Sequence, residues 1–266
     1  MYQKAGQTSI VIYIYKGKGN GKTDPSSYTP ISLLSIISKL WEKVILRRVN
    51  SFLTLNSPKY QQQGFQHNLS CLTTAFALHE TVLYHIGRHC DVYGAGLEQK
   101  VAFDTVRFRA LFLKLGRFGL TGQFLRLAMS LYENLKSVIR TSVSTSAPIM
   151  VKRSARQGGV LSTFLYLVYM NVLWNDIQSS GCGTNVMSIW CGNPTFADDI
   201  SLFALTPLQK MVDIIFRHYK QWNVLIIVEN SSVAVFTKSR SQPSVILCMV
   251  IAQSIRQFRS SGYFLF

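Results

Sequence analysis

The sequence predicts an α+β fold, and three observations support this prediction. Apolar residues recur at helical spacing in several separate segments. Short alternating or β-branched runs lie between those segments, and glycine-rich or polar turn sequences join some of them. The strand-like runs do not alternate regularly with helices, as they would in a doubly wound parallel sheet, so α+β is the class that fits.

In the first third of the chain we expect one strand and two helices. Residues 10–15 predict the strand, and the run Lys16-Gly17-Lys18-Gly19-Asn20-Gly21-Lys22 that follows is too flexible for a helix. This run is either a solvated hairpin turn or a phosphate-contacting loop, and its spacing is not that of a P-loop. Residues 31–52 and 69–85 predict amphipathic helices. The first of these helices should expose a basic side formed by Lys39, Lys43, Arg47 and Arg48.

The rest of the chain predicts further helices and two short strands. Residues 108–135 should form two helices interrupted near Gly119-Leu120-Thr121-Gly122. Residues 160–174 predict a largely buried helix, and residues 207–222 another helix. Two short strands are then expected over residues 224–228 and 233–236.

Two adjacent carboxylates, Asp198 and Asp199, have flanks that predict strands. Residues 191–194 are turn-like, and residues 200–203 alternate apolar and polar. The pair should therefore lie at the tip of a β-hairpin, where two like charges are costly unless a cation neutralises them. Mg²⁺ prefers one or two carboxylates together with substrate phosphates. The pair thus suggests two-metal phosphoryl transfer, with an ordinary solvated turn as the plain alternative.

The composition points to an anionic partner. The 266 residues include 28 Lys and Arg against 12 Asp and Glu, a net charge of +16, while 48% of residues are hydrophobic. Such a globular, basic chain suits nucleic acid first and an anionic membrane surface second. The longest apolar run, residues 160–174, is too short to span a bilayer. The five scattered cysteines predict free thiols in a reducing compartment and not a zinc site.

Three clusters in order carry a family resemblance: residues 97–106, residues 156–162 and the Asp198-Asp199 pair. With them the chain resembles the reverse-transcriptase domain of non-LTR (LINE-like) retrotransposons. That family's motif A reads Asp-x-x-Lys-Ala-Phe-Asp-x-Val, motif B Arg-Gln-Gly-x-x-Leu-Ser-Pro and motif C Ala-Asp-Asp. Residues 28–33 with Lys39, Glu42 and Lys43 resemble its fingers motif. Residues 63–66 resemble its Gly-Phe-Arg motif, and residues 258–262 faintly resemble its primer grip. A group II intron-type reverse transcriptase is a nearby alternative.

The resemblance implies a right-hand polymerase fold of fingers and palm, with an antiparallel palm sheet backed by helices. We expect the fingers over residues 1–88 and 107–150, and the palm over residues 89–106 and 151–266. A thumb and an endonuclease domain are not expected in this chain. Target-primed synthesis in this family implies the nucleus. No import signal is visible, however, so the sequence leaves the intracellular localisation open, and the oligomeric state with it.

The resemblance also implies an RNA-directed DNA polymerase that adds dNTPs to a DNA primer along an RNA template. Two Mg²⁺ ions would serve as cofactors, with Mn²⁺ as a substitute. The expected catalytic residues and metal ligands are Glu98, Asp198 and Asp199. The residues expected to contact the dNTP are Phe103, Arg156, Gln157 and Gly158. The Phe103 ring would exclude a 2′-OH, and its plain alternative is an ordinary core aromatic.

Several chemical positions depart from the family pattern. Glu98 stands where motif A has its metal-binding Asp, and the longer side chain displaces the carboxylate by about 1 Å, enough to slow a reaction substantially. Val228 and Ser231 stand where an Asn and a pyrophosphate-protonating Lys are usual. Other departures occur at Thr29, Gln66, Val101 and Thr163, where the family has Arg, Arg, Lys and Pro. These changes suggest a degenerate copy of doubtful activity.

Two rival hypotheses remain. One is a non-catalytic nucleic-acid-binding remnant of the same fold. The other is a structural or membrane-surface basic protein unrelated to polymerases, in which Glu98, Asp198 and Asp199 would lie far apart.

Overall fold

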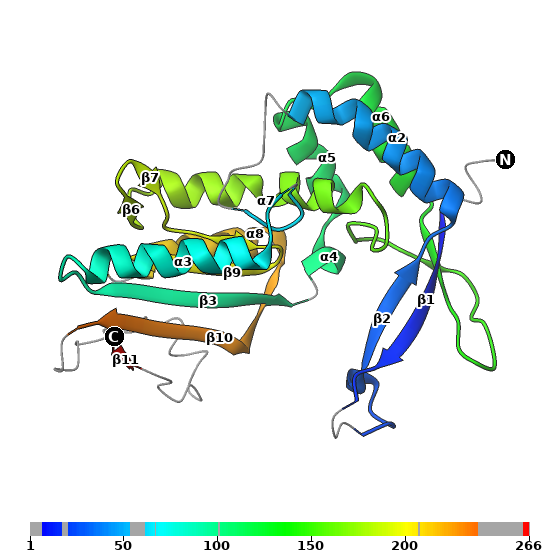
Figure 1. Cartoon of the computed structure of the whole chain (residues 1–266). Coiled ribbons are helices and arrows are strands. Elements are labelled where there is room, and N and C mark those ends of the chain that lie inside the picture. The colour runs from blue at the N-terminus through cyan, green and yellow to red at the C-terminus, as the bar shows by residue number, and fades with distance from the viewer. Residues whose placement is uncertain are drawn as a thin grey trace. The chain divides into compact units, whose positions relative to one another are not determined.

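The computed structural model of the protein describes residues 7–17, 21–53, 62–66, 68–100, 102–206, 208–238 and 263–265. The chain divides into two compact units (Figure 1). Unit 1 comprises Met1–Ser57 and Phe103–Tyr169, and unit 2 comprises Pro58–Ala102 and Met170–Phe266. Helices and sheets of mixed strand direction occur in both parts of the chain, which confirms the predicted α+β class.

Unit 1 contains a four-stranded sheet of order β2-β1-β4-β5. The predicted N-terminal strand is confirmed as β1 (Thr8–Tyr15), which pairs antiparallel with β2 (Tyr28–Leu33). β1 also pairs in parallel with β4 (Lys136–Ile139), which meets β5 (Ile149–Met150). The glycine-rich run lies between β1 and the short 3₁₀ turn η1 (Pro25–Ser27) that precedes β2; residues 18–20 of this run are outside the described residues.

The helix predicted over residues 31–52 begins later than expected. It is α2 (Ile36–Leu53), and residues 31–33 belong instead to strand β2. Pro30 lacks a backbone N–H, and β2 is an edge strand of the sheet, where proline is tolerated. Residues 31–33 stay extended because they pair with residues 10–12 of β1, and the helix begins only after this pairing ends.

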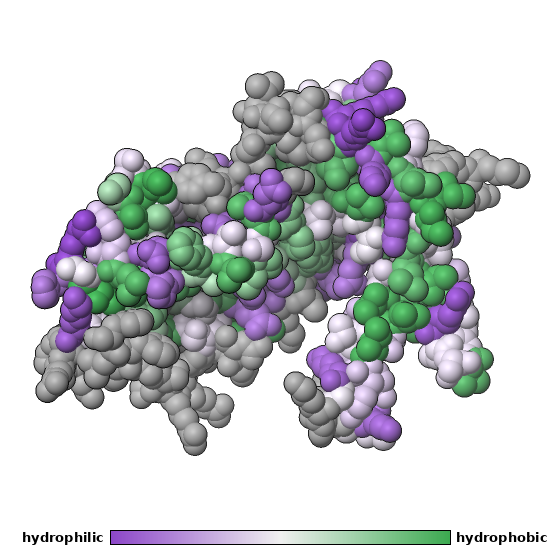
Figure 2. All heavy atoms as spheres, in the orientation of Figure 1, coloured by the Kyte–Doolittle hydropathy of each residue, from purple (hydrophilic) through white to green (hydrophobic). Residues whose placement is uncertain are grey.

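The apolar stripe of α2 faces outward, contrary to the periodicity argument. Over residues 36–49 of α2, the buried positions are Ser38, Glu42, Ile45 and Val49. The exposed positions include the hydrophobic side chains of Ile36, Ile37, Leu40, Trp41 and Val44. Figure 2 shows hydrophobic side chains gathered over α2 and the adjoining β1–β2 region. The ion pair between Glu42 and Arg156 explains this inversion, because it fixes which side of α2 is buried.

Four further helices contribute residues to unit 1. α4 (Ala102–Thr105) is short, and α5 (Phe108–Arg117) and α6 (Gly122–Tyr132) are the two helices predicted over residues 108–135. The break between them is confirmed, with Gly119 at a positive φ of 97°. The predicted buried helix is α7 (Ser162–Ser179), which extends five residues beyond the expected end. α5 and α6 lie wholly within unit 1, whereas α4 and α7 each contain residues of both units.

A buried ion pair connects α2 to the segment before α7. The Arg156 guanidinium contacts the Glu42 carboxylate, and the two side chains are only 4% and 1% exposed. Arg156 Nη2 also donates to Ser38 Oγ at 2.8 Å, and the Leu161 backbone N–H donates to Glu42 Oε2 at 3.0 Å. A charge pair taken out of water stays favourable only when such additional bonds complete it. The pair therefore fixes α2 against the start of α7.

Unit 2 is built on a five-stranded sheet of order β11-β10-β3-β9-β8. Its strands are β3 (Val92–Lys100), β8 (Thr195–Phe196), β9 (Asp199–Ala204), β10 (Leu225–Thr237) and β11 (Tyr263–Leu265). Neighbouring strands are antiparallel, except that β10 and β11 are parallel. The two strands predicted over residues 224–228 and 233–236 are one strand, β10, with an irregular register between Ile227 and Ser232. The irregularity interrupts the alternation of side chains along β10, and this explains why the sequence pattern predicts two strands where the structure has one.

Helix α3 packs on this sheet. The predicted helix over residues 69–85 is α3 (Cys71–Ile86), which begins with a capping box formed by Ser70 and Thr73. Val82 and Ile86 of α3 form a buried cluster with Val92 and Phe203 of the sheet.

The remaining helix of unit 2, predicted over residues 207–222, is α8 (Gln209–Trp222). A small hairpin of β6 (Asn185–Val186) and β7 (Ile189–Trp190) lies between α7 and β8 in the chain. Among the described helices, none combines the length and the hydropathy that a bilayer crossing requires.

Replacing Glu42 by glutamine should lower the free energy of unfolding by about 3–5 kcal/mol, because the Arg156 charge would stay buried without its carboxylate. Urea unfolding followed by circular dichroism measures this change. The control is Glu80→Gln, since Glu80 contacts only its exposed neighbour His79 among the ion pairs described; it should cost less than about 1 kcal/mol. The double variant Glu42→Leu/Arg156→Met should recover most of the loss. A Glu42→Gln variant as stable as the control would contradict this account.

Candidate active site

The Asp198-Asp199 pair lies at a hairpin tip, as the sequence predicts. Phe196 at the end of β8 pairs with Asp199 at the start of β9, which leaves Ala197 and Asp198 as a two-residue turn. Ala197 has a positive φ of 58°. Such a φ is expected at the first central position of tight hairpin turns but is unusual for alanine. The turn therefore forces the two carboxylates close together at one end of the sheet.

Glu98 lies directly opposite Asp199. In the antiparallel pairing of β3 with β9, Glu98 is the partner of Asp199 and Leu97 the partner of Ile200. Facing residues of an antiparallel pair have Cα atoms about 4.5–5.5 Å apart and side chains on the same face. The pairing thus brings Glu98 to the Asp198-Asp199 turn. The rival hypothesis of a protein unrelated to polymerases, which required these acids to be far apart, is wrong.

The three acids influence one another electrostatically. Partial burial raises the pKa of Asp198, and the charge of Glu98 raises it further. The pKa of Asp199 is also raised, first by desolvation and then by the charges of Asp198 and Glu98. Neighbouring carboxylates that raise the pKa of Asp198 and Asp199 in this way are typical of a site that binds a cation.

The donor chemistry of this site fits a hard divalent cation. Carboxylate oxygens are the ligands that Mg²⁺ prefers, and the ion usually takes one or two of them and completes its shell with water and substrate phosphates. Among the residues that the structure describes, no three His, Cys, Asp or Glu side chains, these acids included, are grouped closely enough to hold a metal ion by themselves. An open set of acids is compatible with ions whose remaining ligands come from substrate.

Phe103 is held within unit 1 by an aromatic neighbour. Its ring stacks on Tyr166 of α7, with centroids 4.8 Å apart and planes 20° apart, and it remains half-buried. The Ala155 N–H donates to the Phe103 carbonyl at 2.7 Å, and Ser154 Oγ donates to the Asp104 carboxylate at 3.3 Å. These contacts join the end of motif A to the segment before motif B. The contact of Phe103 with a nucleotide stays a prediction.

The motif B residues contact the segment that resembles the fingers motif. Gln157 Oε1 accepts a hydrogen bond from Ser32 Oγ at 3.1 Å, and a Cβ on Gly158 would lie 2.3 Å from the Ser32 carbonyl oxygen. Gly158 also has a positive φ of 85°. Only glycine fits such a position. Arg156 is buried in its ion pair with Glu42, so its guanidinium has a structural partner. Nucleotide contacts of Arg156, Gln157 and Gly158 stay predictions.

The structure shows what surrounds several of the substituted positions. Ser231 is buried in β10, and its hydroxyl donates to the Ile227 carbonyl at 2.8 Å. Thr29 is exposed on β2, and the Gln66 side chain donates to the Gln62 carbonyl. Thr163 lies in the first turn of α7, and Val228 lies within β10. Val101 and the segment resembling the primer grip, residues 258–262, lie outside the described residues.

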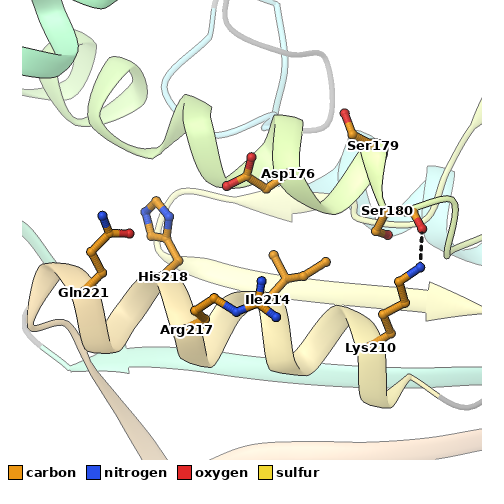
Figure 3. A pocket seen from close by; sticks show the side chains of 8 residues that line it. All are labelled: Asp176, Ser179, Ser180, Lys210, Ile214, Arg217, His218 and Gln221. Atoms are coloured by element: carbon orange, nitrogen blue, oxygen red, sulfur yellow. Dashed lines mark hydrogen bonds between the residues drawn. The ribbon is translucent and has the colours of Figure 1, made fainter.

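A separate pocket lies in unit 2 between the end of α7 and helix α8 (Figure 3). Lys210 Nζ donates to the Ser180 carbonyl at 2.7 Å across it. Lys210 and Arg217 carry positive charges there, and Asp176 is the acid among the lining residues. None of the predicted site residues lines this pocket, so it is not part of the candidate active site. The full lining is Asp176, Ser179, Ser180, Lys210, Ile214, Arg217, His218 and Gln221.

Comparison with known proteins identifies the family. Residues 17–244 match the family described as reverse transcriptase (RNA-dependent DNA polymerase). The RNA-directed DNA polymerase from mobile element jockey of Drosophila funebris is 27% identical over 280 residues, which cover 99% of this chain and 29% of that protein. The probable RNA-directed DNA polymerase from transposon BS of Drosophila melanogaster is 29% identical over 172 residues, or 63% of this chain and 18% of that protein. The chain thus spans less than a third of either relative.

A solved structure supports the fold. The apo telomerase from Candida tropicalis, truncated from its C-terminal domain, matches with a TM-score of 0.60 and 12% identity, over 90% of this chain and 51% of that chain. At this identity the likeness concerns the fold alone. Together with the family match, it agrees with the resemblance drawn from motifs A, B and C, which is confirmed.

Neutralising one of the clustered acids should stabilise the metal-free protein. Glu98→Gln is expected to raise the free energy of unfolding by about 0.5 kcal/mol in EDTA at low salt, because like charges directly opposite on paired strands repel. Urea unfolding measures the gain, and added Mg²⁺ should reduce it by stabilising the wild type preferentially. Asp176→Asn is the control, since Asp176 shares its pocket with Lys210 and Arg217 and should give no gain. Equal behaviour of the two variants would contradict the repulsion argument.

Proposed function

The chain belongs to the reverse transcriptase (RNA-dependent DNA polymerase) family, and from this premise we propose that it synthesises DNA on an RNA template by adding dNTPs to a DNA primer. One observation carries the proposal. β3 and β9 pair so that Glu98 lies opposite Asp199, beside Asp198 in the hairpin turn. Such a set of acids suits nucleotidyl transfer, in which a primer 3′-OH attacks the α-phosphate of a dNTP in line and displaces pyrophosphate.

The proposed roles divide among the acids and the residues of motifs A and B. Glu98, Asp198 and Asp199 would hold two Mg²⁺ ions, or Mn²⁺ in their place. When bound, these ions would neutralise the charge that develops on the attacking and leaving oxygens. Gln157 and Gly158 would lie against the incoming nucleotide, with Arg156 supporting them from its buried pair. The Phe103 ring, fixed by Tyr166, would stand below the sugar and disfavour a 2′-OH.

The finer architecture is part of the same proposal. We assign the fingers to residues 1–88 and 107–150, and the palm to residues 89–106 and 151–266. The antiparallel pairing of β10, β3, β9 and β8 supports the palm assignment. The β1–β2 pair and helix α2 support the fingers assignment, because they carry the segment that resembles the fingers motif.

A second candidate function is nucleic-acid binding without catalysis. Ser231 stands where the family has a pyrophosphate-protonating Lys, and its buried hydroxyl already donates to Ile227. A serine in this setting supplies no proton to a leaving group. The longer side chain of Glu98 adds a second departure at the acids themselves. The net charge of +16 would still support binding to a polyanion.

Primer extension decides between the two functions. With an RNA template, a DNA primer, dNTPs and Mg²⁺, the wild-type chain is expected to add nucleotides slowly, and Asp198→Asn should abolish the addition. Glu98→Asp should increase the rate, since it corrects a carboxylate displaced by about 1 Å, an error that can cost on the order of 10²-fold. No addition by either the wild type or Glu98→Asp, with both shown to be folded, would reject the polymerase proposal and leave the binding function.

Nucleic-acid binding should be strongly salt-dependent under either function. We expect the affinity for an RNA–DNA duplex to fall by about 10³-fold between 50 and 200 mM salt, as counterion release predicts for several phosphate contacts. Fluorescence anisotropy measures this slope. The double variant Lys43→Gln/Arg47→Gln, on the exposed side of α2, should flatten it, whereas Lys210→Gln should not. An affinity independent of salt would remove the electrostatic basis of the proposal.

A further inference from the structure

A buried glutamine adjoins the turn that carries the two aspartates. Gln62 has no exposed surface, and it forms a parallel bridge with Thr195 of β8. The next residue, Gln63, donates its backbone N–H to the Thr195 carbonyl at 2.8 Å. The segment from residue 62 therefore extends the sheet of unit 2 past β8, along the hairpin that ends in Asp198 and Asp199.

The side-chain amide of Gln62 binds both backbone groups of Ala197. Gln62 Oε1 accepts hydrogen bonds from the Ala197 N–H at 2.9 Å and the Gly64 N–H at 2.8 Å. Gln62 Nε2 donates to the Ala197 carbonyl at 2.8 Å. The orientation of the amide is fixed by this network, because an oxygen must face the two N–H groups and the NH₂ must face the carbonyl. Gln62 is the side chain that holds the residue immediately before Asp198.

Ala197 needs such a partner because its backbone conformation is unfavourable. Its φ of 58° lies in the left-handed region, where the Cβ of a residue other than glycine comes too close to the following carbonyl oxygen. Strained conformations of this kind persist only where surrounding contacts over-determine them, and they occur preferentially at functional sites. Two hydrogen bonds from one buried amide to Ala197, with a third that ties the amide to Gly64, provide that constraint here.

Gly64 lets the segment approach the turn closely. A Cβ on Gly64 would lie 2.1 Å from the Ala197 nitrogen and 2.7 Å from its Cα. A larger residue would therefore displace the turn or the segment. We call Gln62, Gly64 and Ala197 the Gln62 clamp.

We propose that Gln62 is a positioning residue for the Asp198-Asp199 pair, acting through the Ala197 turn. It fixes the direction in which the two carboxylates meet a divalent cation, and it contacts neither the cation nor the substrate. This inference rests on the proposed function, since it supplies the acids with the geometry that nucleotidyl transfer requires. Supporting hydrogen bonds behind metal ligands commonly change metal affinity by about 10- to 100-fold when they are removed.

Three variants separate the clamp from general packing. Gln62→Met keeps the length and approximate volume of the side chain but removes all three hydrogen bonds. Gln62→Glu keeps the acceptor toward the N–H groups and places a second carboxylate oxygen against the Ala197 carbonyl. The matched control is Gln63→Met, because Gln63 Oε1 accepts from Thr74 on α3 and not from the hairpin.

The measurement is Mn²⁺ binding by electron paramagnetic resonance, without nucleotide or primer, alongside amide hydrogen exchange of Ala197. Gln62→Met should weaken Mn²⁺ binding by about 10-fold or more and speed exchange at Ala197. Gln62→Glu should give a smaller loss, and Gln63→Met should bind as the wild type does. In chains that extend a primer, Gln62→Met should raise the Mg²⁺ concentration needed for half-maximal rate and leave the KM for dNTP unchanged.

Mn²⁺ binding tests the clamp even in a chain that shows no polymerase activity. Mn²⁺ binding by the wild type, with no primer extension by either the wild type or Glu98→Asp, would reject the proposed function while the variants still test the clamp. The clamp is overturned if Gln62→Met binds Mn²⁺ as the wild type does, if Gln63→Met is weakened equally, or if the wild type binds no Mn²⁺. Should Gln62→Met fail to fold, Gln62→Glu decides in the same way: weakened binding supports the clamp, and unchanged binding overturns it.

Discussion

The pairing of β3 with β9 is the constraint on which the candidate site depends. Ala95 and Leu97 on β3, and Ile200 and Leu202 on β9, are buried on one face of the sheet. Because side chains alternate along a strand, this apolar register sends Glu98 and Asp199 to the other face together. A slip by one residue would separate the two acids. Hydrophobic burial therefore enforces an arrangement of like charges that electrostatics alone would oppose.

The two units use charge in opposite ways. In unit 1 a buried carboxylate meets a buried guanidinium, and the Glu42–Arg156 pair is completed by Ser38 and the Leu161 N–H. In unit 2 three carboxylates lie together, and each raises the pKa of a neighbour or has its own pKa raised. An ion pair whose remaining polar groups are hydrogen-bonded can fix how two segments pack. Like charges held close together instead favour the binding of a cation. This contrast separates the structural motif B arginine from the acids of motifs A and C.

The departures from the family pattern fall on chemical positions more than on framework positions. Gly158 remains glycine where a Cβ would strike Ser32, and Gly64 remains glycine where a Cβ would strike Ala197. Ser231, by contrast, stands where the family resemblance places a proton-donating Lys, and its hydroxyl is bonded within its own strand. Loss of a chemical group need not disturb packing, whereas loss of a framework glycine would. A chain can therefore keep this fold after losing part of its chemistry.

The sequence by itself determined the α+β class, the hairpin around Asp198 and Asp199, the break between α5 and α6, and the family. These features depend on local periodicity, on turn residues and on short motifs, and each of these signals consists of residues that are close together in the sequence. Only the tertiary structure decided which side of α2 is buried, because Glu42 finds Arg156 across 114 positions of the chain. The same holds for Gln62, whose partner Ala197 is 135 positions away. A buried polar side chain is positioned by a partner distant in sequence, and no local pattern of hydrophobicity identifies that partner.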